Sequence, residues 1–312
     1  MTLPEVYVVG APKAGTTALA HWLGAHPDVF WSVPKEPYFW AADHPRQRTH
    51  HGFDTREAYE GLFASSQARA ARLRGEGSTT YLYSRVAAAA ILDAVPDARF
   101  IVCLRNPADL VVSFHRTQLV ALNETERDFA VAWRRSLAGG LPDTEPLEAL
   151  LVDYPRVGRL GAAVQQFLVT VPRDRVHVVV LDDLASDPEA VWAGLLDFLG
   201  LDPGFTPEFR DANPSTKTYR SQVLHRVTHR PPAALAPTMT QLRQWSRTTR
   251  IPGAHRLKDA LYRPAPRPTV APEVRRELTE FFRPDVELLE TLVGRDLAAW
   301  RTPPRVHRSR EG

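Results

Sequence analysis

The chain has 312 residues, 44% of them hydrophobic, which is enough apolar material for the core of one large α/β domain. No stretch approaches the roughly 18 consecutive apolar residues of a membrane-spanning helix, and the start of the chain lacks the plan of a secretory signal. The single cysteine, Cys103, excludes an internal disulfide and fits a reducing compartment. We therefore expect one domain over residues 1–312, located in the cytoplasm.

The formal net charge is only +3, but it is unevenly distributed. Residues 217–267 hold eleven Lys and Arg residues and a single acid, inside a segment rich in Pro, Arg and Thr at 213–272. We expect this segment to form loops with one or two short helices. It could face an anionic ligand, a nucleic acid or a membrane surface, or be an exposed loop. Lysine is rare among the 39 basic residues and occurs only as Lys13, Lys35, Lys217 and Lys258.

Short apolar strands alternate with helices along the chain. In chain order, the sequence predicts a strand at 6–9, helices at 16–23 and 87–95, a strand at 99–104, helices at 107–119, 127–137 and 157–169, a strand at 176–181, and helices at 188–199 and 273–292. Such alternation is typical of a parallel sheet that is covered by helices on both faces. The predicted fold class is α/β.

A glycine-containing turn joins the first strand to the first helix. Its sequence at 10–17 is Gly-Ala-Pro-Lys-Ala-Gly-Thr-Thr. At this place backbone N–H groups and a helix N-terminus form a cradle for an anion. The turn keeps the glycine spacing and the final hydroxyl of the nucleoside-triphosphate loop G-x-x-x-x-G-K-[ST]. However, Thr16 stands where that loop has its lysine, and Lys13 lies three residues earlier.

The displaced lysine changes which anion the turn suits. In nucleoside triphosphatases the loop lysine reaches the β/γ-phosphates, and a strand-end aspartate serves Mg²⁺. Here the strand at 99–104 is followed by Arg105, whereas Asp182 and Asp183 follow the third strand and leave a metal-binding acid open. The displacement favours a shorter anion that is held without Mg²⁺.

Two motifs resemble those of sulfotransferases that use 3′-phosphoadenosine 5′-phosphosulfate (PAPS). Residues 12–17 (Pro-Lys-Ala-Gly-Thr-Thr) resemble the 5′-phosphosulfate loop of that family. Residues 105–107 (Arg-Asn-Pro), with Ser113 on the following helix, resemble its 3′-phosphate motif. Segments at 180–184 and 198–201 are also similar, so the resemblance covers most of the chain in the right order. It implies a P-loop-like fold of three layers with a central parallel sheet flanked by helices.

Other segments resemble the carbohydrate-type and bacterial branch of the family. Residues 35–39 (Lys-Glu-Pro-Tyr-Phe) match its Lys-Glu-Pro-aromatic segment, in which the glutamate is the usual candidate for the catalytic base. Residues 75–81 resemble a second segment of this branch, but Gly77 stands where a lysine commonly follows the glutamate. A loose match at 217–220 resembles the basic loop that closes over the 3′-phosphate.

The resemblance implies transfer of a sulfuryl group from PAPS to a hydroxyl or an amine of a small-molecule, carbohydrate or natural-product acceptor. Lys13 would stabilise the departing phosphate oxygen and Glu36 would accept the acceptor's proton. The residues expected to bind PAPS are Lys13, Ala14, Gly15, Thr16, Thr17, Arg105, Ser113, Lys217, Tyr219 and Arg220. No metal and no nucleic acid is expected, contact with a membrane surface has no support beyond the basic segment, and the oligomeric state is left open.

Each assignment has an alternative. Arg105 could be an ion-pair partner, Ser113 could bond its own helix backbone, and Glu36 could be a partner of the adjacent lysine. Rival bases are His115, His50 and His51; with His44, the latter two lack the spacing of a metal site. The rival functions are a P-loop kinase that uses ATP with Mg²⁺, and a non-catalytic protein that binds nucleotides or polyanions.

Overall fold

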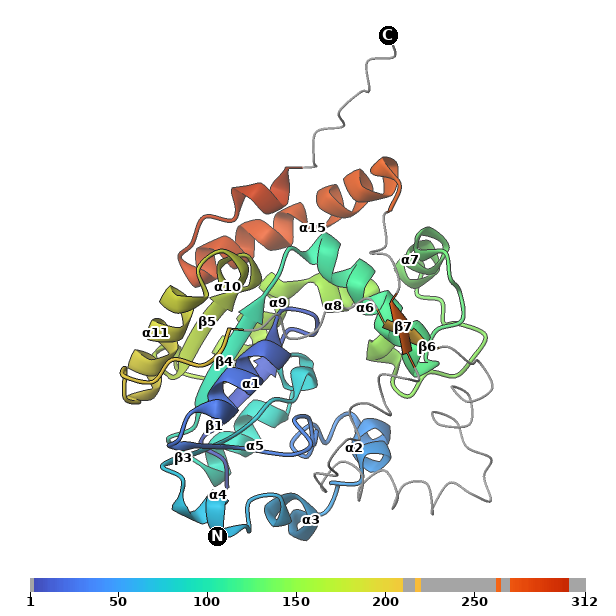
Figure 1. The fold of residues 1–312 in the computed structure, drawn as a ribbon. Helices are drawn as coiled ribbons and strands as arrows, with labels where there is room; N and C mark the ends of the chain where they lie inside the picture. The colour runs from blue at the N-terminus through green and yellow to red at the C-terminus, as the bar shows by residue number, and fades with distance from the viewer. Residues whose placement is uncertain (1–2, 210–216, 220–261, 265–269, 303–312) are drawn as a thin grey trace, which may run out of the picture.

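The centre of the molecule is a five-stranded parallel sheet (Figure 1). A computed structural model of the chain describes residues 3–209, 217–219, 262–264 and 270–302. The sheet order is β2-β3-β1-β4-β5, with β1 Val6–Gly10, β2 Val29–Trp31, β3 Leu73–Glu76, β4 Arg99–Leu104 and β5 Val176–Val180. The predicted strands at 6–9, 99–104 and 176–181 are confirmed as β1, β4 and β5, except that Leu181 begins a helix. The α/β fold with a central parallel sheet is confirmed too.

Two strands of the sheet were not predicted. β2 has three residues and β3 has four, Leu-Arg-Gly-Glu, none of which is β-branched. Their register with neighbouring strands is nonetheless regular: Val6 of β1 pairs with Gly75, and Trp31 pairs with Gly75 from the other side. These segments have no strand-like sequence pattern of their own. They are strands because they pair with neighbouring strands in the sheet.

Helices and 3₁₀ turns connect the strands. The described α-helices are α1 Thr16–Ala25, α2 Pro45–His51, α3 Arg56–Gly61, α4 Ser66–Ala70, α5 Ala87–Ala94, α6 Pro107–Ala121, α7 Phe129–Leu137, α8 Tyr154–Gly158, α9 Leu160–Thr170, α10 Leu181–Ser186, α11 Pro188–Leu199 and α15 Pro272–Val293. The described 3₁₀ turns are η1 Thr79–Tyr83, η2 Ala149–Val152, η3 Arg173–Arg175 and η5 Ala298–Arg301.

The helices flank the sheet in two layers. On one side, α1 and α11 are linked where His26, at the end of α1, packs on Trp192 of α11. On the other side, α9 contacts both α5 and α15. Right-handed crossovers that leave the sheet centre in opposite directions place their helices on opposite faces. The strand order reverses around β1, so the carboxyl end of β1 lies beside a topological switch point, where open α/β sheets bind ligands.

The helix predicted at 157–169 is two helices. Arg159 leaves the helical conformation between α8 and α9 (φ −76°, ψ 72°). The first N–H groups of α9 are then satisfied from α15: the Asp285 carboxylate accepts from Gly161 N at 2.7 Å and from Ala162 N at 2.9 Å. A Cβ on Gly161 would lie 2.3 Å from the Asp285 carbonyl oxygen. The break therefore depends on a partner more than 120 residues away along the chain.

The core is built on β1 and β4. All five residues of β1 are buried, and Tyr7 stacks on Phe100 of β4, which in turn meets Phe167 of α9. Each such aliphatic or aromatic side chain contributes roughly 1.5–3 kcal/mol on burial. Cys103 is fully buried in β4 as a small apolar side chain, and burial raises its thiol pKa to about 12.

Little of the basic segment lies within the described residues. β6 Lys217–Tyr219 pairs antiparallel with β7 Tyr262–Pro264. The loops and short helices expected across 213–272 otherwise fall outside the described part of the chain. Within that part, no helix has the length and apolar character needed to cross a membrane.

Candidate functional site

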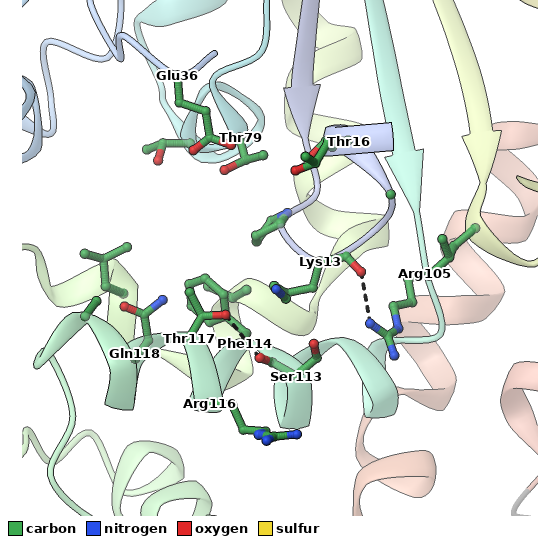
Figure 2. Close-up of a pocket in the computed structure, with 18 of the residues that line it drawn as sticks. Lys13, Thr16, Glu36, Thr79, Arg105, Ser113, Phe114, Arg116, Thr117 and Gln118 are labelled. Carbon is green, nitrogen blue, oxygen red and sulfur yellow. Dashed lines mark hydrogen bonds between the residues drawn. The ribbon is translucent and has the colours of Figure 1, made fainter. Parts of the chain in front are cut away.

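A cavity of about 1360 Å³ opens at the carboxyl ends of β1, β3 and β4. Its walls come from the loop after β1, the segment 36–51, η1 after β3, and α6 after β4. Figure 2 shows Glu36 and Thr79 on one side of this cavity, with Phe114, Thr117 and Gln118 of α6 facing them. Lys13 and Arg105 lie at its inner end. Sequence segments far apart in the chain thus converge on one space.

The loop after β1 requires its two glycines. Gly10 has φ +149°, and a Cβ there would lie 2.9 Å from the Thr79 carbonyl oxygen. Gly15 has φ +87°, and a Cβ would lie 2.7 Å from the Leu184 side chain. Lys13 is left-handed as well (φ 64°), a conformation that costs a non-glycine residue roughly 1–2 kcal/mol. Strain of this kind is characteristic of binding loops.

The N-terminus of α1 opens onto the cavity. Gly15 is its N-cap, and among the described residues no side chain caps this helix end; its first turn also contains no acid. Gly15, Thr16 and Thr17 line the cavity, whereas Ala14 is buried beneath the loop and can offer only its backbone. An uncapped helix N-terminus favours an anion through its N–H groups and its dipole.

Positive charge is concentrated beside this helix end. The Arg105 guanidinium donates to the Lys13 carbonyl oxygen at 3.0 Å, so the residue after β4 braces the loop after β1. Burial lowers the pKa of the Lys13 ammonium, and repulsion from Arg105, Lys35 and Arg116 lowers it further, against the attraction of Glu36. A bound anion would relieve this repulsion.

The first turns of α6 supply a hydroxyl to the same region. Ser113 is buried, and its Oγ has no hydrogen-bond partner among the residues that the structure describes. The residue that bonds back to the helix is Thr117, whose Oγ1 donates to the Ser113 carbonyl oxygen at 3.3 Å (Figure 2). Nearby, Asp109 is paired with Arg275 of α15 at 2.5 Å. Ser113 therefore has hydrogen-bonding capacity left for a ligand.

Glu36 lies across the cavity with both carboxylate oxygens occupied. Lys35 Nζ donates to Oε1 at 2.6 Å, and the Tyr38 hydroxyl donates to Oε2. The pairing with the adjacent lysine is thus real, yet the carboxylate also lines the cavity and is accessible from it. These two hydrogen bonds fix the position of the carboxylate in the cavity wall.

The histidines considered as rival bases separate into two groups. His50 and His51 of α2 line the cavity, whereas His115 is not among its lining residues. The His115 Nε2 is 2.8 Å from the Glu126 carbonyl oxygen, and its ring packs between Phe129 and Tyr154. Burial lowers the His115 pKa. This histidine belongs to the core.

The acids that could have held Mg²⁺ are engaged in the fold. Asp182 accepts a hydrogen bond from the Trp300 indole at 2.9 Å, and Asp183 pairs with Arg295. Both contacts attach the C-terminal helix region to α10, which follows β5. Across residues 3–209 and 270–302, no three His, Cys, Asp or Glu side chains gather as a metal site, His44, His50 and His51 included.

A fully buried carboxyl, Glu76, lies behind the cavity wall. Ser78 Oγ, Tyr81 Oη and Tyr59 Oη donate to it at 2.7, 2.7 and 3.2 Å. Burial raises the pKa of Glu76 to about 7, while these three hydrogen bonds lower it. The sequence indicates only that the segment containing this glutamate resembles one of the family. It does not reveal the role of Glu76, because its partners come from separate parts of the chain.

The same hydroxyls hold the segment that carries Glu36. Ser78 Oγ accepts from Tyr38 N at 3.0 Å, Tyr81 Oη accepts from Trp40 N at 3.2 Å, and Tyr59 Oη accepts from the Trp40 indole at 2.9 Å. Each hydroxyl has one hydrogen and receives one N–H, so its hydrogen points to the Glu76 carboxylate. Glu76 is therefore the hub that fixes residues 38–40.

The outer end of the cavity has a different character. Gln118 and Asn123 of α6 and its C-cap region bond to each other at 2.9 Å, and Arg46 pairs with Glu145 at 2.6 Å. No signal in the sequence singles out these residues, because their only shared property is their place in the fold. Of the expected basic loop, Lys217 and Tyr219 have their backbone in β6, and Arg220 lies outside the described residues.

Comparisons with known proteins agree with this geometry. Residues 4–207 match the profile of the Sulfotransferase family. The mouse heparan sulfate glucosamine 3-O-sulfotransferase 3B1 is 27% identical over 298 residues, which cover 94% of this chain and 64% of that protein. The bovine bifunctional heparan sulfate N-deacetylase/N-sulfotransferase 2 is 28% identical over 207 residues, 64% of this chain and 22% of its own length.

A solved structure matches over nearly the whole chain. It is a sulfotransferase from Alicyclobacillus acidocaldarius, with a TM-score of 0.69 and 25% identity over 97% of this chain and all of that one. This chain thus spans about two thirds or less of the curated relatives, but the full length of a bacterial one. With the family profile matched from the first strand to beyond α11, the chain belongs to the sulfotransferase family.

Proposed function

We propose that this protein transfers a sulfuryl group from PAPS to a hydroxyl or an amine of an acceptor, and releases 3′-phosphoadenosine 5′-phosphate (PAP). The observation that carries the proposal is the convergence at the N-terminus of α1 of Lys13, Arg105 and the Ser113 hydroxyl, which has no hydrogen-bond partner within the described residues. PAPS supplies an activated sulfuryl group and two separate phosphates, and this chain offers two adjacent anion sites.

The loop after β1 suits the 5′-phosphosulfate end of the donor. Backbone N–H groups of residues 14–17 would hold the 5′-phosphate at the helix N-terminus. Lys13 would stabilise the negative charge that develops on the departing phosphate oxygen. Burial and the neighbouring cations lower the pKa of the Lys13 ammonium. Negative charge that is added nearby would therefore stabilise the charged form of this side chain.

Arg105 and Ser113 suit the 3′-phosphate, which distinguishes PAPS from ATP. A guanidinium and a free hydroxyl can give charge-assisted hydrogen bonds to the same phosphate. Lys217, Tyr219 and Arg220 remain part of the proposal as the loop over this phosphate, by resemblance to the family. No metal is needed at either site.

Glu36 would accept the acceptor's proton as the new bond to sulfur forms. It faces the cavity from the side opposite α6, and hydrogen-bond donors on both of its oxygens hold the carboxylate in place. The relatives named for heparan sulfate point to a carbohydrate acceptor, and a small molecule or natural product also fits the proposal.

We also propose that the chain forms a single sulfotransferase domain over residues 1–312. The C-terminal helix α15 packs on α9 and α6, and its Asp285 caps α9. An element beyond the basic segment thus completes the core of the preceding sheet.

The proposal is tested by incubating the protein with PAPS and a panel of carbohydrate, phenol and amine acceptors, with PAP release and sulfated product as readouts. We expect PAP release that depends on an acceptor and does not depend on Mg²⁺. The Glu36→Gln variant should lose about 10²–10⁴-fold in turnover, because glutamine cannot take the proton. Its affinity for PAP should stay unchanged. Consumption of ATP with Mg²⁺, with PAPS left intact, would contradict the proposal.

A further inference from the structure

Lys35 does not itself line the cavity, but it joins two residues that do, Thr16 and Glu36. Its Nζ donates to Thr16 Oγ1 at 3.0 Å and to Glu36 Oε1 at 2.6 Å. Thr16 belongs to the loop proposed to hold the phosphosulfate, and Glu36 is the proposed base. Lys35 is one of only four lysines in a chain that otherwise uses arginine, and it reaches this position from the loop after β2.

The side chain of Lys35 reaches the site by crossing Gly77. A Cβ on Gly77 would lie 3.0 Å from Lys35 Cε and 3.4 Å from its Cγ, and the next neighbour is Trp31 at 3.5 Å. The Lys35 side chain therefore makes the two closest contacts in the space where a side chain at position 77 would begin. Gly77 N also donates to the Lys35 carbonyl oxygen at 2.8 Å, so the two residues lie side by side along their backbones.

The position of the ammonium relative to Thr16 and Glu36 indicates its target. In an in-line transfer, sulfur lies between the departing oxygen, near the loop after β1, and the acceptor oxygen, near the base. Lys35 Nζ contacts one residue of each side. Because Thr16 Oγ1 accepts from Lys35, its own hydrogen is left to donate elsewhere. Lys35 has three donors, and two of them are used by Thr16 and Glu36 within the described chain.

We propose that Lys35 is a second lysine of the donor site, which reaches across Gly77 to bind the sulfonate end of the donor between Thr16 and Glu36. This inference rests on the proposed function. It also accounts for the glycine at position 77, because the Lys35 side chain occupies the space in which a side chain there would begin. Lys13 then serves the departing oxygen, and Lys35 serves the oxygens that move with sulfur.

The test compares the affinity for PAPS, which carries the sulfonate, with that for PAP, which does not. Calorimetric titration of Lys35→Ala should show PAPS affinity reduced about tenfold or more, because a charge-assisted hydrogen bond is lost. PAP affinity should change by less than about threefold. Arg175→Ala is the matched control: it also removes one positive charge, but at the opposite edge of the sheet, and should leave the ratio of the two affinities unchanged.

The decisive variant moves the lysine from position 35 to position 77, directly after β3. With Lys35 shortened, position 77 has room for a side chain, so Lys35→Ala combined with Gly77→Lys should recover most of the lost preference for PAPS. An unchanged PAPS/PAP ratio in Lys35→Ala would overturn the inference, as would equal loss of both ligands or a folded double variant without recovery. If the unaltered protein bound neither ligand, the proposed function itself would fail, and the two failures are thereby distinguished.

Discussion

Glu76 has an unusual combination of complete burial and three hydroxyl donors. Burial raises the pKa of this carboxyl from 4.5 to about 7, so the folded protein takes up a proton there that the unfolded chain releases between these pH values. The folded state therefore loses stability as pH rises from about 4.5 to 7, by roughly 3 kcal/mol in total. Below that window the contribution is absent, and above it the loss is complete.

The Glu76→Gln variant measures this contribution. We expect its free energy of unfolding in urea to fall less between pH 5 and pH 8 than that of the unaltered protein, because glutamine does not titrate. At pH 5 the variant should be the less stable of the two, since its amide offers two donors to the surrounding hydroxyls where the protonated Glu76 carboxyl offers one. The same pH dependence in both proteins would show that Glu76 does not titrate in this window.

Residue types and their spacing identify much of the candidate site. What they cannot identify are contacts between residues that lie far apart in the chain. Lys13, Arg105, Ser113 and Glu36 lie in local motifs, so the sequence alone could name them. The network around Glu76 joins residues 38–81 through contacts that no local pattern encodes. Whether the named residues bind PAPS is still a prediction.

At the scale of elements, the clasp between α9 and α15 is the clearest long-range feature. Asp285 accepts from the N–H groups of Gly161 and Ala162, the second and third residues of α9, and Gly161 allows the close approach. Asp285→Ala should lower the free energy of unfolding by about 1–2 kcal/mol, the usual cost of losing a helix cap. Thr291→Ala, an exposed position on the same helix, should change it by less than about 0.5 kcal/mol. Urea denaturation of both variants gives the comparison, and equal effects would show that the clasp adds nothing to stability.

Helices and strands with a strong sequence pattern could be predicted. Elements that form only through contacts with distant parts of the chain could not. The central strands β1 and β4 and the helices that follow them have apolar periodicity and turn signals, and their boundaries came out within about two residues. β2 and β3 are strands only because β1 and one another offer edges to pair with. The break before α9 lies inside a helical pattern, and its cause is a carboxylate on α15.

At the scale of the whole molecule, the strand order brings together the residues proposed to bind PAPS. β1 and β4 are neighbours in the sheet, although almost 90 residues separate their ends along the chain. The loop with Lys13 and the strand end with Arg105 therefore meet. The N-terminus of α1 adds its backbone N–H groups to the same place. The adjacency of the two proposed anion sites follows from the order of strands in the sheet, and not from either motif alone.

The central claim is that this pair of sites selects a nucleotide with a 3′-phosphate and needs no metal. Calorimetric titration with PAP, run beside adenosine 5′-monophosphate and beside ATP with Mg²⁺, tests it most directly. We expect tight binding of PAP that chelator does not change, binding of the monophosphate weaker by about tenfold or more, and weak binding of ATP with Mg²⁺. Tight binding of ATP with Mg²⁺ alone, or equal affinity for PAP and the monophosphate, would contradict the account.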